Sequence, residues 1–201
     1  MQKKIIYLAN IKQPSAIISA EIGTILNSIR SSLDVLITSV ATRHGISNLE
    51  DAYFPLAKTE ADFLRLNYKG SEVIRQFPNS DQNIIASFKP WRGGNRLLVA
   101  LHDMDILRKH QRLISVKALP NMISLSPDAF RNGLQFISMW GGFQDDAVLA
   151  STHIDADSVD IHLSLDIVFN EVGAASGKGV VDALRDFANL ADSIIWAFDI
   201  P

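Results

Sequence analysis

The stretch that decides the fold is residues 15–44, which read SAIISAEIGTILNSIRSSLDVLITSVATRH. Apolar residues recur in it at three- and four-residue steps, the spacing that places side chains on one face of an α-helix. Pro14 suits the first turn of a helix, and Gly45 suits its end. We therefore expect one long helix with an apolar stripe, formed by Ile18, Ile22, Ile25, Ile29, Leu33, Leu36 and Val40.

A second helix is predicted over residues 96–110. The breaker sequence Lys89-Pro-Trp-Arg-Gly-Gly-Asn95 precedes it, and we expect Asn95 to cap its N-terminus. Apolar residues surround most of its axis, which is typical of a buried helix. Shorter helices are predicted over residues 59–66, 70–76 and 80–88. Between the long helix and these, Tyr53-Phe-Pro55 is predicted to be extended or a turn, because a residue before proline avoids the helical region.

Further along the chain the apolar period changes to two, which indicates strands. The predicted strands are residues 113–119, 134–140, 147–152 and 159–169, with a turn at Gly141-Gly142 and residues 144–146. A closing helix follows Gly177 and Gly179. The pattern predicts an α+β fold, a long-helix bundle with a small antiparallel sheet inserted before the C-terminal helix. We expect one domain over residues 1–201, mainly helical over 14–111, with antiparallel strands over 112–170 and the closing helix over 177–198.

Composition limits the class of protein. The chain has 201 residues, 47% of them apolar and 20% charged, with a formal net charge of −3, which is ordinary globular usage and too mild to indicate a nucleic-acid binder. The lack of cysteine excludes thiol catalysis and Cys-ligated metals, and it fits a reducing compartment. The apolar run Ile5–Ala9 is too short for a signal peptide, and no segment approaches the ~20 apolar residues of a membrane helix. We expect a cytoplasmic protein with no membrane contact.

The best candidate site lies on the helix predicted over residues 96–110. Because a helix advances about 100° per residue, His102, Asp105 and Lys109 fall on one narrow stripe, with His110 at its edge. On the first long helix, Arg30 and Asp34 form an i,i+4 ion pair beside the apolar stripe. If the two helices pack together, these groups meet in a partly dry seam.

Two interpretations of this seam remain open. Partly dry surroundings shift pKa values and can tune a general acid or base, so the seam can be a binding or catalytic site. A buried ladder of ion pairs can equally fix the register of two helices without any chemistry.

The turn before the second helix is another candidate. Glycine lets a backbone approach a ligand, and helix N-terminal amides favour anions, so a small anion or a nucleic-acid phosphate can bind there. The alternative is a plain turn with an N-cap, and the spacing of a Walker loop is absent. The residues concerned are Arg92, Gly93, Gly94, Asn95 and Arg96.

A cluster of acidic and imidazole groups over residues 153–162 suggests metal binding at first sight. Val159 stands where a calcium loop needs an oxygen ligand, and the central glycine is missing. We therefore predict no metal site, and no cofactor.

Several motifs together resemble those of a known bacterial family of about this size. They are Ile29-Arg-Ser-Ser-Leu-Asp34, Tyr53-Phe-Pro55 and the segment from Lys89 to His110. In that family a motif close to Arg-Ser-Ala-Leu-Asp-His lies on one long helix, and Gly-Gly-Asn, Leu-His, Leu-Asp and Lys-His lie on the next. The resemblance spans roughly residues 20–115 and brings no established activity with it.

More distantly, the helical part is similar to the HEPN superfamily, helical bundles that include metal-independent RNases and nucleotide-binding proteins. Active members use an Arg-x4–6-His motif, typically completed across a dimer, in which histidine moves a proton and arginine stabilises phosphate charge. Arg30 matches the arginine, but Val35 stands where Arg-x4-His needs histidine. Arg96 and His102 also fit the spacing, although six residues place them about 120° apart on one helix.

The resemblance implies a HEPN-like module for interaction or ligand binding without catalysis, as a homodimer through its long helices. One alternative is a metal-independent RNA endonuclease that uses Arg30, His102 and His110. Another is a small-anion or nucleotide-binding protein. The partners implied are a second copy of the chain, RNA or a small anion.

Overall fold

A computed structural model describes residues 5–9, 11–110, 113–125, 135–136, 147–152, 161–170 and 175–198. The α+β class expected from the sequence is confirmed. Contacts divide the chain into two units: a strand unit, Met1–Ser15 with Val116–Val168, and a helical unit, Ala16–Ser115 with Phe169–Pro201. The single domain and the HEPN-like character of the bundle stay predictions.

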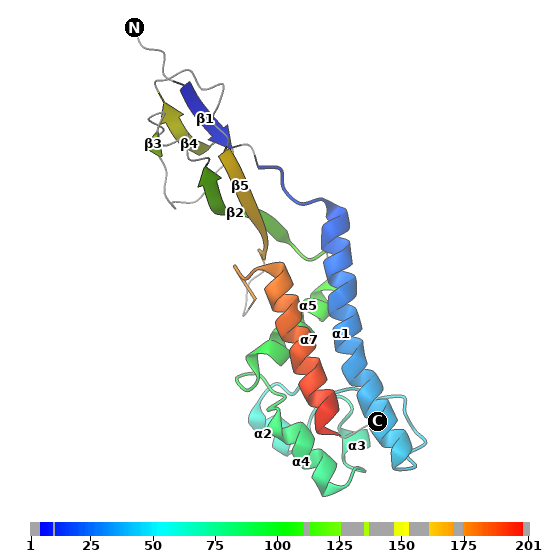
Figure 1. The fold of residues 1–201 in the computed structure, drawn as a ribbon. Coiled ribbons are helices and arrows are strands. Elements are labelled where there is room, and N and C mark those ends of the chain that lie inside the picture. The colour runs from blue at the N-terminus through cyan, green and yellow to red at the C-terminus, as the bar shows by residue number, and fades with distance from the viewer. Residues whose placement is uncertain are drawn as a thin grey trace. The chain divides into compact units, whose positions relative to one another are not determined.

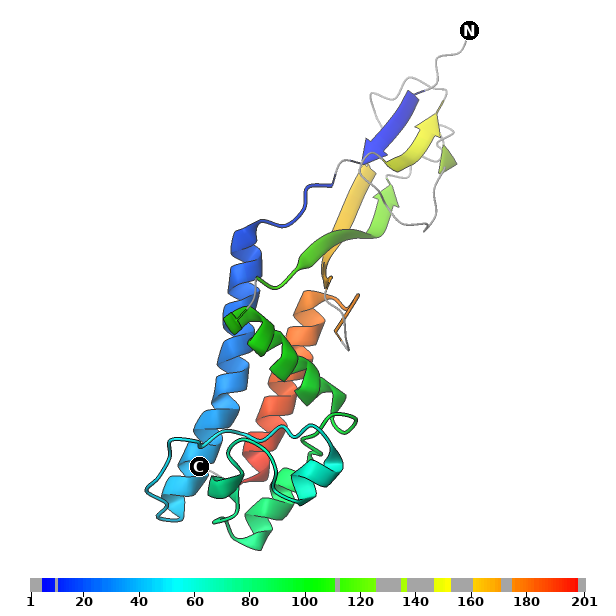
Figure 2. The same cartoon turned by 180° about the vertical axis from the view of Figure 1, so that it is seen from behind.

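Three long helices form the framework of the helical unit (Figures 1 and 2). Each contacts the other two, and both views show them side by side. Three short helices gather near the C-terminal end of the first one. The long helices are α1 (Ala16–Arg43), α5 (Arg96–His110) and α7 (Val180–Ala197), and the short ones are α2 (Glu60–Leu64), α3 (Ser71–Ile74) and α4 (Asn79–Ser87).

The apolar stripe of α1 is buried at four positions and partly buried at Ile18 and Ile29, with one correction. Ile25, which the sequence pattern places in the stripe, is 44% exposed, whereas Leu26 and Ile37 are fully buried. On a helix Ile25 lies about 60° from Ile22, so it falls at the edge of the buried face. The C-terminal half of α1 packs into the main core together with Phe54, Phe77, Ile85, Leu98, Ile194 and Phe198.

Close approach between α1 and α5 depends on a small residue. A Cβ atom built on Gly23 would lie 2.6 Å from Cδ of Arg108. The aliphatic part of Arg108 therefore lies directly against the backbone of α1. This contact brings the polar stripes of the two helices within reach of one another.

The helix boundaries follow local sequence signals. The helix predicted over residues 96–110 is present with those bounds, because the Oδ1 atom of Asn95 accepts hydrogen bonds from the backbone N–H groups of Leu97 and Leu98. The closing helix begins three residues later than predicted, after Gly179.

The strand unit contains two small sheets. In the first, of order β1-β4-β3, strands β1 (Ile5–Ala9) and β3 (Gln135–Phe136) both pair antiparallel with β4 (Ala147–Thr152), and a register shift lies between Tyr7 and Leu8. The second pairs β2 (Val116–Leu125) with β5 (Ile161–Phe169). The sequence pattern did not predict β1, whose only signal is a short run rich in β-branched and aromatic residues.

The alternation predicted for the last strand is present in part, because Leu165, expected on its apolar face, is 44% exposed. His162, Ser164 and Asp166 of β5 are exposed, whereas Leu163 and Ile167 are partly buried. Most of the cluster of acidic and imidazole groups, residues 153–160, lies outside the described residues. So do the predicted turn at Gly141-Gly142 and residues 144–146.

Candidate functional site

A cavity of about 360 Å³ lies in the helical unit beside α1 and α5. Five residues singled out from the sequence line it: Arg30 and Asp34 from α1, and His102, Asp105 and Lys109 from α5. The structure thus brings together the two stripes, as the sequence analysis expected. The rest of the lining consists of Tyr53, Phe54, Leu56, Lys69 and Ile106.

Arg30 and Asp34 hold the backbone of Phe54. Arg30 donates one hydrogen bond to Oδ1 of Asp34 at 2.6 Å and another to the carbonyl oxygen of Phe54 at 2.8 Å. The same Asp34 oxygen accepts from the Phe54 N–H at 2.9 Å. An ion pair on α1 therefore satisfies both backbone groups of a residue in an irregular, buried segment, where unpaired polar groups are costly. This is a structural role for both residues.

Asp105 is the most deeply buried carboxylate of the cavity, at 3% exposure. Its Oδ2 atom lies 2.6 Å from Nζ of Lys109, one helical turn away. Its Oδ1 atom is buried and has no hydrogen-bond partner among the described residues. Buried polar atoms are normally hydrogen-bonded, so this unpaired oxygen is an exception among the described residues.

His102 lies one turn before Asp105 and is partly buried. Burial lowers the pKa of His102, the positive charge of Arg30 lowers it further, and Asp103 opposes both. The ring is therefore neutral near pH 7, with one nitrogen that donates and one that accepts. Neither ring nitrogen has a hydrogen-bond partner among the described residues.

Sequence reasoning missed one wall of the cavity. Tyr53, Leu56 and Lys69 come from loops, and helical spacing cannot place them. Nζ of Lys69 lies 4.2 Å from the centroid of the Tyr53 ring and 3.9 Å from a carboxylate oxygen of Asp51. The motif Tyr53-Phe-Pro55 was the only available signal for this wall.

Two expectations tied to the Arg-x4-His motif have different outcomes. Val35 is 63% exposed, so a side chain at this position points away from the face on which Arg30 is buried. His110 is the last residue of α5, but its side chain lies outside what the structure describes.

The turn before α5 uses its polar groups internally. Arg92 donates two hydrogen bonds to Asp103, at 2.9 and 2.6 Å. The N–H groups of Gly94 and Asn95 donate to the carbonyl oxygens of Trp91 and Lys89. Together with the Asn95 cap, these contacts are those of a structural turn.

Backbone conformation and close packing explain why this turn has glycine at two positions. Gly93 has a φ of +89°, which favours glycine. A Cβ atom on Gly94 would clash with the carbonyl oxygen of Lys89. Arg96, the first residue of α5, is exposed and does not line the cavity.

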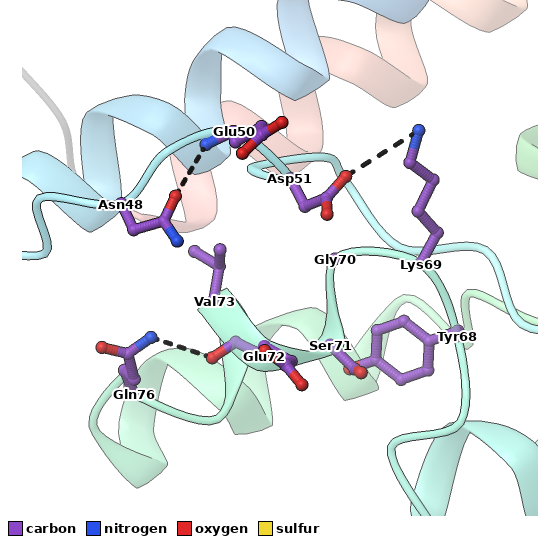
Figure 3. Close-up of a pocket in the computed structure, with 10 residues that line it drawn as sticks. All are labelled: Asn48, Glu50, Asp51, Tyr68, Lys69, Gly70, Ser71, Glu72, Val73 and Gln76. Carbon is purple, nitrogen blue, oxygen red and sulfur yellow. Dashed lines mark hydrogen bonds and ion pairs between the residues drawn. The ribbon is translucent and has the colours of Figure 1, made fainter.

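A second cavity of about 340 Å³ lies around the loop before α3 (Figure 3). Its rim is acidic, with Glu50, Asp51 and Glu72, and an amide of Gln76 donates to the carbonyl oxygen of Glu72 at 3.0 Å. Asn48, Tyr68, Lys69, Gly70, Ser71 and Val73 complete the lining. Lys69 borders this cavity as well as the first.

Tyr68 has a buried hydroxyl without a hydrogen-bond partner in the described part of the chain. Burial raises its pKa to about 12, although the charge of Arg75 acts in the opposite direction. Its ring stacks on Phe63, with centroids 5.3 Å apart. The phenol is therefore a neutral packing group at physiological pH.

A third polar cluster connects the end of α1 with α4. Asp81 is 7% exposed and accepts hydrogen bonds from His44 at 2.8 Å and Arg43 at 3.1 Å. Burial raises the pKa of Asp81, but the hydrogen bonds from His44, Arg43 and Ser80 outweigh it and hold the pKa below its usual value. Every oxygen of this carboxylate is paired, which indicates a structural tie.

Two kinds of feature are absent from the described residues. They contain no group of three or more histidine, aspartate or glutamate side chains that could hold a metal ion. Among the same residues, no helix combines the length and the apolar character needed to cross a bilayer.

The comparisons with known proteins gave no match. No protein-family model matches the sequence, and neither the curated proteins nor the solved structures contain a significant match. The function must therefore be argued from the site alone.

Proposed function

We propose that this protein is a ligand-binding module, built on a HEPN-like helical bundle, whose binding site is the cavity lined by α1 and α5. One observation carries the proposal: Asp105 lines the cavity at 3% exposure, and one of its carboxylate oxygens has no hydrogen-bond partner among the described residues. Leaving such an acceptor without a partner costs about 1–3 kcal/mol, so a ligand whose binding turns this oxygen towards a donor gains that energy.

The surroundings of Asp105 support this proposal. His102 adds two unused ring nitrogens, and Ile106, which is 39% exposed, adds apolar surface. A few convergent polar groups on a partly apolar wall are what small-molecule sites have in common, and the cavity falls at the lower end of their usual range of about 300–1,000 Å³. The lack of cysteine fits a cytoplasmic location, and the homodimer stays a prediction.

The test is a nuclear magnetic resonance screen of small polar compounds that are neutral, cationic or anionic. Compounds that bind should move the amide signals of α5 around His102 and Asp105. Ile106→Trp fills the cavity and should abolish these shifts, whereas Val35→Trp, at an exposed position of α1, should leave them unchanged. If no compound of any charge class moves these signals, the proposed function is wrong.

A metal-independent RNA endonuclease is the second candidate. It is favoured by one observation: Arg30 and a neutral His102 line the same cavity. It ranks second because Arg30 already donates to Asp34 and to the Phe54 carbonyl. Labelled RNA incubated with EDTA should be cut by the wild type and not by His102→Ala if this candidate is right. Equal cleavage by both proteins would remove it.

We do not propose a small-anion site at Gly93-Gly94, because the polar groups of this turn are paired with one another. Arg92 is paired with Asp103, and the Asn95 side chain occupies the amides of the first turn of α5.

A further inference from the structure

If the α1/α5 cavity binds a ligand, as proposed above, the groups that the ligand can reach narrow its chemical class. The carboxylates are the less accessible groups of the lining, because Asp105 is buried and the side chain of Asp34 is 25% exposed. The unpaired Oδ1 atom of Asp105 is itself buried, so a ligand does not reach it in this structure. The side chains of Lys109 and Lys69, in contrast, are 40% and 71% exposed. A ligand that enters the cavity therefore meets mainly ammonium groups.

The ammonium group of Lys109 is held in place by its own helix. Its Nζ atom lies 2.6 Å from Oδ2 of Asp105, one turn earlier on α5. An ammonium group has three N–H donors, so this contact leaves two of them for another acceptor. Asp105 is thus a positioning residue, which fixes the ammonium group without itself contacting the ligand.

Lys69 lines the same cavity from the loop before α3. Its Nζ atom lies 4.2 Å from the centroid of the Tyr53 ring and 3.9 Å from a carboxylate oxygen of Asp51 (Figure 3). Asp51 is 60% exposed and does not line this cavity. So long and so exposed an ion pair contributes little free energy. An anion in the cavity can therefore replace Asp51 as the partner of Lys69 at little cost.

The other polar groups of the cavity can donate to an anion or are offset in charge. The hydroxyl of Tyr53 and the ring nitrogens of His102 have no hydrogen-bond partner among the described residues, so each side chain can donate one bond. The second oxygen of Asp34 also lacks a partner and repels an anion. Arg30, which lies 2.6 Å from the first oxygen, offsets that charge. We therefore expect an anion nearer to the lysines than to Asp34.

The balance of charge selects among the possible ligands. Three cationic side chains and two carboxylates line the cavity, an excess of one positive charge, which attracts a monoanion and repels a cation. Phosphate groups are commonly held by the N-terminus of a helix or by a free guanidinium group. Of the described residues that line the cavity, none lies in the first turn of α1 or α5, and Arg30 already donates to Asp34 and Phe54. A carboxylate therefore fits better than a phosphate.

We propose that the cavity binds a small organic acid, whose monoanionic carboxylate is held by the ammonium groups of Lys109 and Lys69. The apolar part of the acid lies against Tyr53, Leu56 and Ile106, which supply the apolar surface of the lining. The volume of about 360 Å³ suits one ring or a short alkyl chain.

The test compares four probes that share one ring, by amide chemical shifts in titrations of the whole protein. Benzoate is the carboxylate, benzamide its neutral analogue, benzylamine the cation and phenyl phosphate the phosphate. Benzoate should shift the α5 amides in a saturable manner and bind roughly tenfold more tightly than benzamide or benzylamine, because only the carboxylate forms charge-assisted hydrogen bonds with the lysines. Added salt should weaken the binding of benzoate and leave that of benzamide unchanged.

Three lysine variants locate the carboxylate. Lys109→Met should weaken benzoate binding roughly tenfold, because it removes a partly buried charge. Lys69→Met should weaken it roughly threefold, because this charge is more exposed. Lys178→Met removes an exposed lysine that does not line the cavity and should leave binding unchanged. If Lys109→Met does not fold, because Asp105 loses its counter-charge, Lys69→Met and the charge-preserving Lys109→Arg, which should retain binding, decide the question.

The titration of His102 gives an independent readout of where the carboxylate lies. Without a ligand, burial and the charges of Arg30 and Arg92 lower the pKa of His102, whereas Asp103 and Asp105 raise it. A bound carboxylate adds a negative charge to the cavity and favours the imidazolium form. Saturating benzoate should therefore raise the midpoint of His102, and benzamide should not. An unchanged midpoint would show that the carboxylate binds elsewhere, which overturns the proposal.

The remaining outcomes separate this proposal from the proposed function. Benzamide or benzylamine binding as tightly as benzoate overturns the carboxylate class and leaves the cavity as a binding site, as does tighter binding of phenyl phosphate. Benzoate binding that Lys109→Met and Lys69→Met both leave intact overturns it as well. No binding of any of the four probes also overturns the carboxylate class, whereas the proposed function fails only if the wider screen gives nothing.

Discussion

Replacing Asp34 by alanine should strongly destabilise the helical unit. Its Oδ1 atom accepts two hydrogen bonds, from Arg30 at 2.6 Å and from the Phe54 N–H at 2.9 Å. Arg30 is only 6% exposed, so the substitution leaves a buried cation without its counter-charge and a backbone donor without an acceptor. Phe54 itself is part of the main core, so its backbone cannot easily move out to water.

The magnitude follows from burial. Removing one partner of a buried ion pair costs about 3–5 kcal/mol. The Asp34 side chain is 25% exposed, so water can reach part of the site and the lower end of the range applies, about 3 kcal/mol. Asp34→Asn keeps an acceptor oxygen for Phe54 but loses the charge, and we expect a smaller loss of about 1–2 kcal/mol.

Urea unfolding followed by far-ultraviolet circular dichroism measures these losses, because the described helices all belong to the helical unit. Asp103→Ala is the matched control: it also breaks a pair with an arginine, Arg92, but both side chains are about half exposed. An exposed pair contributes about 0–1 kcal/mol. If Asp34→Ala loses no more stability than Asp103→Ala, the structural role assigned to the Arg30–Asp34 pair is wrong.

Three further predictions test other features of the helical unit. Gly23→Ala should lower stability by about 1–3 kcal/mol through overpacking, because its Cβ would lie 2.6 Å from Cδ of Arg108. Alanine normally favours a helix, so a higher unfolding free energy in urea would refute the close contact. Hydrogen bonds, led by that from His44, hold the pKa of Asp81 below its usual value. The ionised carboxylate therefore stabilises the fold above the usual carboxyl pKa of about 4, and this contribution is lost as the pH falls through the lowered pKa. Asp81→Asn should therefore be less stable than the wild type at neutral pH but lose less stability on acidification. Parallel curves of unfolding free energy against pH for the two proteins would count against the structural role of Asp81. In a proton resonance titration, His102 should have a midpoint below its usual 6.5, and a midpoint at or above 6.5 would contradict its burial beside a cation.

Local signals explain how far the fold could be predicted. The bounds of α5 follow from a breaker, the cap at Asn95 and apolar spacing, all of which act within a few residues. β1 was missed because its pairing partner, β4, lies more than a hundred residues away in the chain. Ile25 was misplaced because spacing alone does not say where the edge of the buried face lies.

The candidate site was predictable to the same extent. Helical periodicity places His102, Asp105 and Lys109 on one stripe, and the packing of α5 against α1 brings them to the cavity. The loop wall of Tyr53 and Lys69 could not be derived, because loops follow no period and their position depends on the docked core. Nor could the sequence show that the backbone of Phe54, rather than a second side chain, is what the Arg30–Asp34 pair holds.

The sequence left two interpretations of the polar seam open, a structural ladder or a binding site, and the hydrogen bonds divide these roles between the helices. On α1, Arg30 and the Oδ1 atom of Asp34 are committed to the backbone of Phe54. On α5, one carboxylate oxygen of Asp105 and both ring nitrogens of His102 have no hydrogen-bond partner among the described residues. A reaction that requires a mobile arginine would have to break the α1 contacts first, whereas ligand binding requires only what α5 already offers. Of the two proposals, ligand binding beside α5 therefore requires fewer contacts to be broken than RNA cleavage does.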